Sequence, residues 1–300
     1  MSFSARLWRA VDDKGTPAMV GLDPRPGHFP EPFRARAAAG GDAAARATRD
    51  YHRALIDVVA AKVAIVKPQS AFFEQLGAAG FAALADAVGY AKERGLLVLM
   101  DAKRGDIGST SEAYADAFLS GEAFPACDAL TINPYLGEDA CQPFFDAARR
   151  HRAGLFVLVK TSNPGAGLFQ DHGDPPLADR VAELVRRWGD QLHDEDGWSS
   201  IGAVVGATRP EELAHFRALM PRAPILLPGF GFQGGSATGL EPAFDRRGRG
   251  GVVNASRSIL WAHERGGLRG LSGWEGQVEA GLDERIGALA PRRAGAGRVA

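Results

Sequence analysis

The stretch Leu96-Leu97-Val98-Leu99-Met100, followed at once by Asp101-Ala102-Lys103, decides which fold we expect for this chain of 300 residues. A continuous apolar run of this length is typical of a strand that is buried on both faces. Further short apolar runs share this character, and each is followed by a polar or glycine-rich stretch. These runs lie at residues 18–22, 63–66, 129–132, 155–159, 201–205, 225–227 and 251–253.

Stretches with the spacing of amphipathic helices lie between the apolar runs. Examples are residues 43–61, 80–94, 177–193, 210–220 and 274–289. Strands that alternate eight times with helices are typical of a (β/α)₈ barrel, the TIM barrel, and we expect a single α/β domain over residues 1–300. An open, doubly wound sheet is the alternative.

Three segments fall outside this regular pattern. Residues 27–42 form a Pro/Gly/Arg/Ala insertion after the first run, and residues 229–250 form a long glycine-rich loop after the seventh. Residues 291–300 form a Gly/Ala/Arg tail that we expect to be disordered. None of the three has the character of a domain boundary.

The composition excludes several classes of partner. The chain carries 35 Lys+Arg against 36 Asp+Glu, so it lacks the basic excess that nucleic-acid binding requires. No uncharged apolar run approaches the roughly 20 residues of a membrane span, and the first fourteen residues lack the apolar core of a signal peptide. Two cysteines, Cys127 and Cys141, are too few for a disulfide framework. We therefore expect a cytoplasmic protein that binds neither nucleic acid polymers nor membranes.

Charged residues directly follow the first three apolar runs. Asp23 follows the first run and Lys67 the second. Asp101 and Lys103 follow the third, and Asp106 comes just beyond them. Catalytic residues of a TIM barrel lie at the carboxyl ends of its strands, and consecutive strands are neighbours, so these side chains can converge. Such clusters of ionised groups are often catalytic, although ordinary salt bridges that cap the barrel are the alternative.

Residues 228–235, with the sequence PGFGFQGG, indicate a phosphate loop. They match the G-x-G-x-x-G pattern of dinucleotide sites, but they follow the seventh run, and the acid expected about 20 residues later is absent. TIM barrels commonly bind phosphate after their seventh and eighth strands. Arg257 follows the eighth run and carries a guanidinium suited to phosphate. Residues 160–165, which include Ser162, place hydroxyls and an amide after the fifth run.

The sequence gives little support to a metal site. Its seven histidines are scattered and none ends an apolar run, and there is no H-E-x-x-H motif or Cys/His cluster. We therefore expect no metal and no cofactor, with lysines as the catalytic cations.

The segment from Asp101 to Ile107, DAKRGDI, resembles the D-x-K-x-x-D-I signature of the orotidine 5'-phosphate decarboxylase family. Residues 21–24 and 66–69 resemble the first two strand segments of that family, and residues 228–235 and 254–258 resemble its phosphate end. The resemblance runs from about residue 20 to residue 259, and it fits the longer bacterial branch (type 2) best. Gly108 departs from the family pattern, because proline often holds that position.

The resemblance implies decarboxylation of orotidine 5'-monophosphate to UMP and CO₂ in de novo pyrimidine biosynthesis, without a metal or cofactor. Lys103 would protonate C6 of the pyrimidine, and Asp101 would lie against the substrate carboxylate. Lys67 would hold Asp101 and a ribose hydroxyl, and Asp23 would bind ribose.

Further roles follow from the same resemblance. Asp106 and Thr110 would reach into the site of a partner subunit, which makes the protein an obligate homodimer. Ser162 would read the pyrimidine edge. The substrate-binding residues at the phosphate end would be Pro228, Gln233, Gly234, Gly235 and Arg257. Arg246, Arg247 and Arg249 in the same loop are further candidates for phosphate contact.

Three other functions are weighed against this one. Related phosphosugar barrels share the D-x-K-x-x-D pattern, so a metal-dependent lyase such as a hexulose-phosphate synthase is one alternative. A non-catalytic nucleotide-binding protein could lose Asp101 or Lys103, but both are present. A dehydrogenase would rest on the glycine pattern alone.

Overall fold

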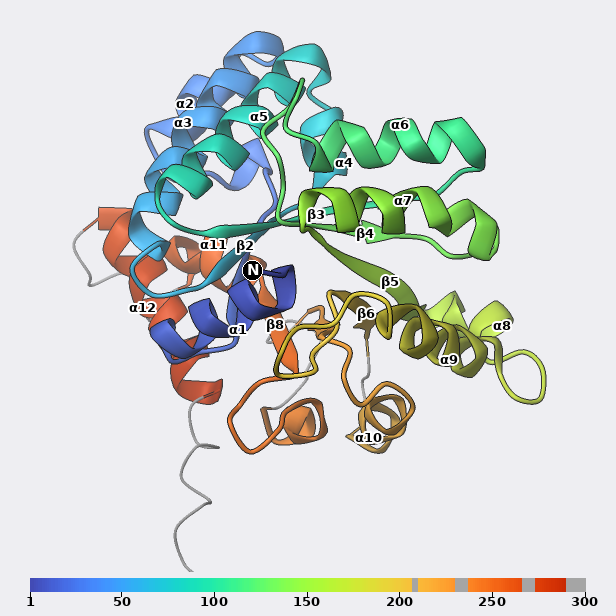
Figure 1. The fold of residues 1–300 in the computed structure, drawn as a ribbon. Coiled ribbons are helices and arrows are strands. Elements are labelled where there is room, and N and C mark those ends of the chain that lie inside the picture. The colour runs from blue at the N-terminus through green and yellow to red at the C-terminus, as the bar shows by residue number, and fades with distance from the viewer. Residues whose placement is uncertain (207–209, 230–236, 266–272, 290–300) are drawn as a thin grey trace, which may run out of the picture.

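The computed structural model describes residues 1–206, 210–229, 237–265 and 273–289 (Figure 1). In the described part of the chain, eight parallel strands close into a barrel in chain order. They are β1 (Ala18–Leu22), β2 (Ile65–Pro68), β3 (Leu97–Arg104), β4 (Ala129–Ile132), β5 (Gly154–Lys160), β6 (Ile201–Val205), β7 (Ile225–Leu227) and β8 (Gly251–Ala255). Strand β8 pairs with β1, so that Val253 lies opposite Ala18. The predicted TIM barrel is confirmed, and the open sheet is wrong because this pairing closes the ring.

Helices follow the strands and surround the barrel (Figure 1). They are α1 (Phe3–Lys14), α2 (Phe33–Ala37), α3 (Gly41–Val59), α4 (Ser70–Glu74), α5 (Gly77–Glu93), α6 (Gly108–Leu119), α7 (Glu138–His151), α8 (Gly167–Gln170), α9 (Leu177–Gly189), α10 (Pro210–Leu219), α11 (Arg257–Leu260) and α12 (Gly273–Leu289). Short 3₁₀ turns lie at Pro26–His28, Pro164–Ala166, Ala237–Ala243 and Ala262–Glu264. Helix α3 shows why such segments are helical: Ala44, Thr48, Tyr51 and Leu55 recur every three or four residues and are all buried.

Helix α1 closes the amino end of the barrel. The Ser2 hydroxyl caps it by accepting the Ala5 N–H, and Gly15 ends it in the left-handed conformation. Its buried face, which includes Phe3, packs against side chains that point into the barrel. Gly154 leaves the room for this contact, because a Cβ there would stand 2.1 Å from the Phe3 ring. This helix was not among the predicted elements.

The core has two parts, as in other barrels of this kind. One cluster fills the barrel interior and includes Met19, Leu99 and Phe156. The other lies between the strands and the surrounding helices and includes Val66, Val98 and Ile225. Strands β1 and β6 are buried along their whole length, which is why they are continuous apolar runs rather than alternating ones.

The insertion at residues 27–42 packs over α3 rather than forming a separate layer. The rings of Phe29 and Phe33 lie 4.5 and 5.6 Å from that of Tyr51, measured between centroids. Phe33 also meets Trp274 of α12 edge to face. In the predicted phosphate loop, residues 230–236 lie outside the described residues, and so does the predicted tail at residues 291–300. Among the described helices, none combines the length and apolarity that a membrane crossing requires.

Candidate active site

Asp101 is the centre of a charged cluster at the carboxyl ends of β2 and β3. The Lys67 Nζ donates to Asp101 Oδ2 at 2.7 Å, and the Lys103 Nζ donates to Asp101 Oδ1 at 2.5 Å. The side chains of Lys67 and Asp101 are only 5% and 8% exposed, whereas that of Lys103 is 41% exposed. The cluster therefore has a buried base and one ammonium group that faces outward.

Two uncharged side chains complete the shell around the Asp101 carboxylate. Gln69 Nε2 donates to Oδ2 at 3.0 Å, and the Thr131 hydroxyl contacts Oδ1 at 3.1 Å. Neither residue was assigned a role from the sequence. Gln69 could have been found from its position, because it lies two residues after Lys67 and residues so spaced share a face of a strand.

Each charge of the cluster favours the ionised form of its neighbours. Burial opposes ionisation of Asp101, but Lys67 and Lys103 outweigh that effect and hold the pKa of this carboxyl well below its usual range. Burial alone would lower the pKa of Lys67, yet Asp101 and then Asp23 raise it above its ordinary value. Both members of the buried pair are therefore ionised at neutral pH.

Asp23 lies just after β1. It belongs to the cluster because its carboxylate interacts electrostatically with Lys67 and raises the pKa of that lysine. Its Oδ1 is buried and has no hydrogen-bond partner among the described residues. A buried carboxylate oxygen without a donor is costly, so this atom is suited to accept a hydrogen bond from a ligand hydroxyl.

Lys103 has an unusual backbone conformation. Its φ angle is +48°, in the left-handed region that side chains other than glycine rarely adopt. The pairing of β3 with β4 shifts register between Met100 and Arg104, so β3 carries a bulge at this point. Such backbone strain is of order 1–3 kcal/mol and clusters at functional sites. Strand β3 also extends to Arg104, beyond the apolar run from which it was predicted.

Asp106 lies in the segment that leads into α6 and Thr110 lies in the first turn of that helix, and neither has a hydrogen bond to the Asp101 cluster among the described contacts. Asp106 is half-buried, and its Oδ1 accepts the N–H of Ile107. Thr110 is exposed. Both residues are thus available at the surface beside the carboxyl end of β3.

The residues after β5 form a polar rim. Ser162 is half-buried, and Gly206 lets it approach β6, because a Cβ at Gly206 would stand 2.8 Å from the Ser162 nitrogen. Lys160 is buried and forms an ion pair with Asp171 just past α8. Lys160 is therefore a third lysine at this end of the barrel.

The phosphate end is described in part. Pro228 is half-buried after β7, and Arg257 begins α11 after β8. Gln233, Gly234 and Gly235 lie outside the described residues.

Strands β1 and β8 add polar atoms beside this end of the barrel. Asn254 Nδ2 donates to Ser256 Oγ at 3.1 Å, and Asn254 Oδ1 is buried without a described partner. Gly21 makes room for this pair, because its Cβ would stand 1.9 Å from Ser256 Oγ. Asn254 is therefore a further candidate for ligand contact that was not assigned a role from the sequence.

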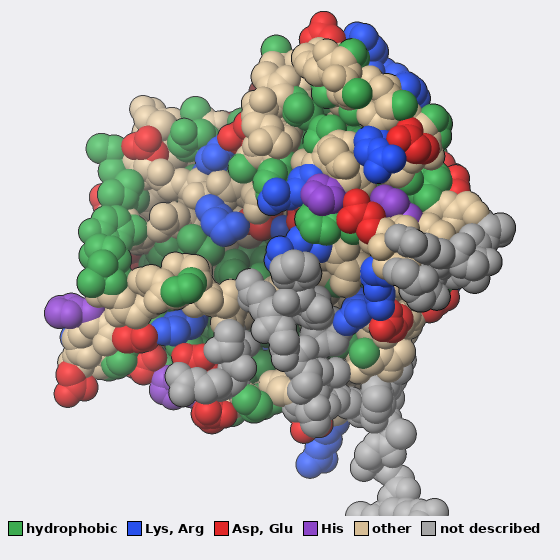
Figure 2. All heavy atoms as spheres, turned by 180° about the vertical axis from the view of Figure 1, so that it is seen from behind, with side chains coloured by type: hydrophobic (Ala, Val, Ile, Leu, Met, Phe, Trp, Pro, Cys, Tyr) green, Lys and Arg blue, Asp and Glu red, His purple; other side chains and the backbone are tan. Residues whose placement is uncertain are grey.

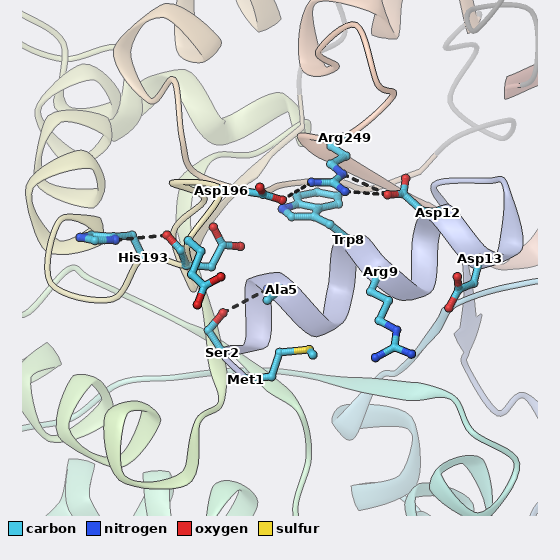
Figure 3. Close-up of a pocket in the computed structure, with 12 residues that line it drawn as sticks. Met1, Ser2, Ala5, Trp8, Arg9, Asp12, Asp13, His193, Asp196 and Arg249 are labelled. Atoms are coloured by element: carbon cyan, nitrogen blue, oxygen red, sulfur yellow. Dashed lines mark hydrogen bonds and ion pairs between the residues drawn. The ribbon is translucent and has the colours of Figure 1, made fainter.

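Arg249 does not belong to the phosphate end, contrary to its candidacy from the sequence. It lies before β8, at the amino end of the strand, where it pairs with Asp12 at 2.7 Å and Asp196 at 2.6 Å (Figure 3). These residues line a cavity of about 670 Å³ beside α1. Because the whole of β8 separates Arg249 from the carboxyl end, it is misplaced for a phosphate bound there.

The face behind that of Figure 1 carries a concentration of cationic side chains. Helix α1 lies in front of the barrel in Figure 1, so Figure 2 views the opposite face. Lys and Arg side chains gather near its centre, with histidine and acidic side chains beside them. Within the described ranges, no group of three or more His, Cys, Asp or Glu side chains is placed to hold a metal ion.

A closed (β/α)₈ barrel with an ionised Lys–Asp–Lys cluster at adjacent strand ends defines a class: TIM-barrel enzymes that work through lysine and carboxylate side chains. Residues 20–266 match the model of the orotidine 5'-phosphate decarboxylase / HUMPS family. The chain belongs to this family, which confirms the resemblance seen in the sequence.

Individual relatives cover most of the chain. It is 47% identical to an orotidine 5'-phosphate decarboxylase of Rhodopirellula baltica over 273 residues, which are 88% of this chain and 90% of the relative. It is 45% identical to that of Deinococcus radiodurans, with coverage of 87% and 90%. The solved structure of Leishmania donovani OMP decarboxylase is similar with a TM-score of 0.72 and 32% identity, and the match covers 97% of this chain and 99% of that one.

Proposed function

We propose that this protein decarboxylates orotidine 5'-monophosphate to UMP and CO₂, in pyrimidine biosynthesis in the cytoplasm. The observation that carries the proposal is the Lys67–Asp101–Lys103 cluster, with its buried carboxylate between two ammonium groups. Relatives that cover nearly nine-tenths of the chain bear the name of this activity, which supports the proposal.

Lys103 is the proposed proton donor. Loss of CO₂ leaves an electron pair at C6 of the pyrimidine, and a nearby ammonium group stabilises this carbanion and then protonates it. The Lys103 side chain is the part of the cluster that faces outward, so its Nζ can reach a substrate above the strand ends. The bond from C6 to the carboxylate breaks, CO₂ leaves, and the Lys103 proton takes its place.

Asp101 and Lys67 prepare the site for that step. An ionised Asp101 beside the substrate carboxylate produces like-charge repulsion that disappears when CO₂ leaves. Lys67 keeps Asp101 ionised, since its ammonium group lies 2.7 Å from the carboxylate. In this scheme no metal or cofactor takes part.

The rest of the substrate is bound by the surrounding strand ends. The unpartnered oxygen of Asp23 accepts a ribose hydroxyl, and Ser162 reads the pyrimidine edge. Pro228, residues 233–235 and Arg257 form the phosphate side. Because the phosphate lies far from the reacting bond, its binding energy can be used to close the site and exclude water.

We propose that a second copy of the chain completes the substrate-binding site, with Asp106 and Thr110 supplied by the partner subunit. The surface around them supports an interface, because Ile107, Tyr135 and Leu136 are 62%, 74% and 50% exposed. Mixing Lys103→Ala and Asp106→Ala chains should restore activity, since one site of each hybrid dimer is then wild type. No recovery after verified subunit exchange contradicts the shared site.

The function is tested by following orotidine 5'-monophosphate loss by ultraviolet absorbance. Lys103→Ala should abolish turnover while UMP still binds, and Lys62→Ala, which changes a lysine paired with Asp283 far along the chain, should retain it. Turnover by the Lys103→Ala variant would overturn the mechanism. The same assay with a chelator separates this activity from that of a metal-dependent phosphosugar lyase.

A further inference from the structure

We propose that Thr131 is a positioning residue for the reaction: its hydroxyl fixes the left-handed turn of β3 and the Asp101 carboxylate, and thereby aims the Lys103 ammonium group. This inference rests on the proposed function and deepens it. Thr131 lies in β4, the neighbour of β3, and its side chain is fully buried.

One hydroxyl group connects three parts of the cluster. Thr131 Oγ1 accepts the N–H of Ala102 at 3.0 Å and the N–H of Lys103 at 2.9 Å. It lies 3.1 Å from Asp101 Oδ1, to which it donates its proton. The Met100 carbonyl, at 3.5 Å, is a more distant acceptor for the same proton. A hydroxyl has one proton and two lone pairs, so these contacts use its whole hydrogen-bonding capacity.

The backbone needs this hydroxyl because the strand pairing fails there. The register of β3 on β4 shifts between Met100 and Arg104, and pairing resumes where Asn133 N–H donates to Arg104 at 2.8 Å. Inside the bulge, the N–H groups of Ala102 and Lys103 both donate to Thr131 Oγ1. A valine of the same shape would leave two donors unpaired, which costs more than the mean value of a hydrogen bond.

The turn determines where the ammonium group lies. With a φ of +48° at Lys103, the chain bends so that its Nζ returns to Asp101 Oδ1 at 2.5 Å. Lysine has a long side chain with many rotamers, and its exposed position in this site supplies little packing to hold it. Thr131 therefore acts on both partners of the Lys103–Asp101 ion pair. It accepts a hydrogen bond from the Lys103 backbone N–H, and it donates one to Asp101 Oδ1, the atom that the Lys103 ammonium group contacts.

The consequence is a specific kinetic signature. Misplacement of a reacting group by about 1 Å can cost a hundredfold in rate. Thr131 lies in β4, which other strands of the barrel separate from β7 and β8 at the phosphate end, so substrate and product binding should change little. We expect Thr131→Val to lower kcat by about ten- to a hundredfold while KM and the Kd of UMP stay within about threefold.

The experiment compares Thr131→Val with Thr131→Ser, which keeps the hydroxyl and should restore kcat to within about threefold of wild type. Thr48→Val is the matched control, because Thr48 is also fully buried but its hydroxyl has no described partner. If the valine variant does not fold, Thr131→Cys, whose thiol is a weak donor and acceptor, makes the same test.

The outcomes separate this inference from the proposed function. No turnover by the wild-type protein overturns the function itself. Wild-type turnover with an equally active Thr131→Val variant overturns the positioning role alone. Parallel loss of kcat and UMP binding, or failure of Thr131→Ser to restore kcat, also overturns it, because a merely structural threonine would behave in that way.

Discussion

The buried carboxylate of Asp101 should make a large contribution to stability that Asp101→Asn removes. Asparagine has the same shape, but it leaves the Lys67 ammonium group, on a side chain only 5% exposed, without the charge that compensates it. Removal of one partner of a buried ion pair costs about 3–5 kcal/mol. The Lys103 contact adds little because its side chain is 41% exposed. We therefore expect the free energy of unfolding to fall by about 3–5 kcal/mol.

Urea unfolding at pH 7 measures this loss, with an unchanged slope showing that the unfolded state is the same. Asp86→Asn is the matched control, because it breaks the pair of Asp86 with Arg53 at the surface and should cost less than about 1 kcal/mol. The double variant Lys67→Met/Asp101→Asn should recover at least half of the loss, since the Lys67 ammonium group is then no longer buried without the Asp101 charge. A loss for Asp101→Asn no larger than that of the control refutes the reasoning.

The pH dependence of the same difference has a definite sign. The folded-state pKa of Asp101 is depressed, so its contribution is fully present above the unfolded pKa of about 3.9 and is lost as the pH falls through the folded value. The difference between wild type and Asp101→Asn should thus stay constant from pH 7 to about pH 5 and shrink below about pH 4. A difference that shrinks between pH 7 and pH 5 contradicts this assignment.

Three further predictions concern residues outside the cluster. Burial lowers the pKa of His52 to about 4, so the free energy of unfolding should fall by about 3 kcal/mol as the pH drops from 6.5 to 4. Urea unfolding at several pH values in this range should show a weaker dependence of that free energy on pH for His52→Gln than for wild type. An equal pH dependence in the two proteins contradicts the assignment. The half-buried Arg217 guanidinium donates to the carbonyls of residues 220, 223, 243 and 250, so Arg217→Met should lower Tm by roughly 6–12 °C with UMP affinity retained. In calorimetric titrations, Arg257→Ala should weaken UMP far more than uridine, whereas Arg249→Ala should leave both affinities within about twofold; equal losses in the two variants would refute the placement of Arg249.

The strands could be predicted because their signal is local. Runs such as Ile201–Val205 are buried on both faces, so their apolar composition alone identifies them as strands. Strand β3 extends past its apolar run because Arg104 pairs with Ile132 of β4 beyond the register shift, despite the polarity of the segment. Helix α1 was missed although Phe3, Leu7 and Val11 have helical spacing.

The site was predicted where charges end a strand and missed where uncharged polar residues sit inside one. Lys67, Asp101 and Lys103 converge as expected from the barrel rule. Thr131 is one hydroxyl within an apolar run, and its role depends on a bulge in the neighbouring strand that sequence periodicity does not reveal. Arg249 was only one of several open candidates for phosphate contact because it is close to the glycine loop, although its position just before the eighth run indicates the amino end.

The most direct test of the central claim is the loss of orotidine 5'-monophosphate absorbance, measured for wild type with and without EDTA and for Lys103→Ala. We predict turnover by the wild-type protein that EDTA does not change, and no turnover by Lys103→Ala in a protein that still binds UMP. Absence of wild-type turnover, its abolition by EDTA, or activity that survives in Lys103→Ala would contradict a decarboxylase that works through its lysine.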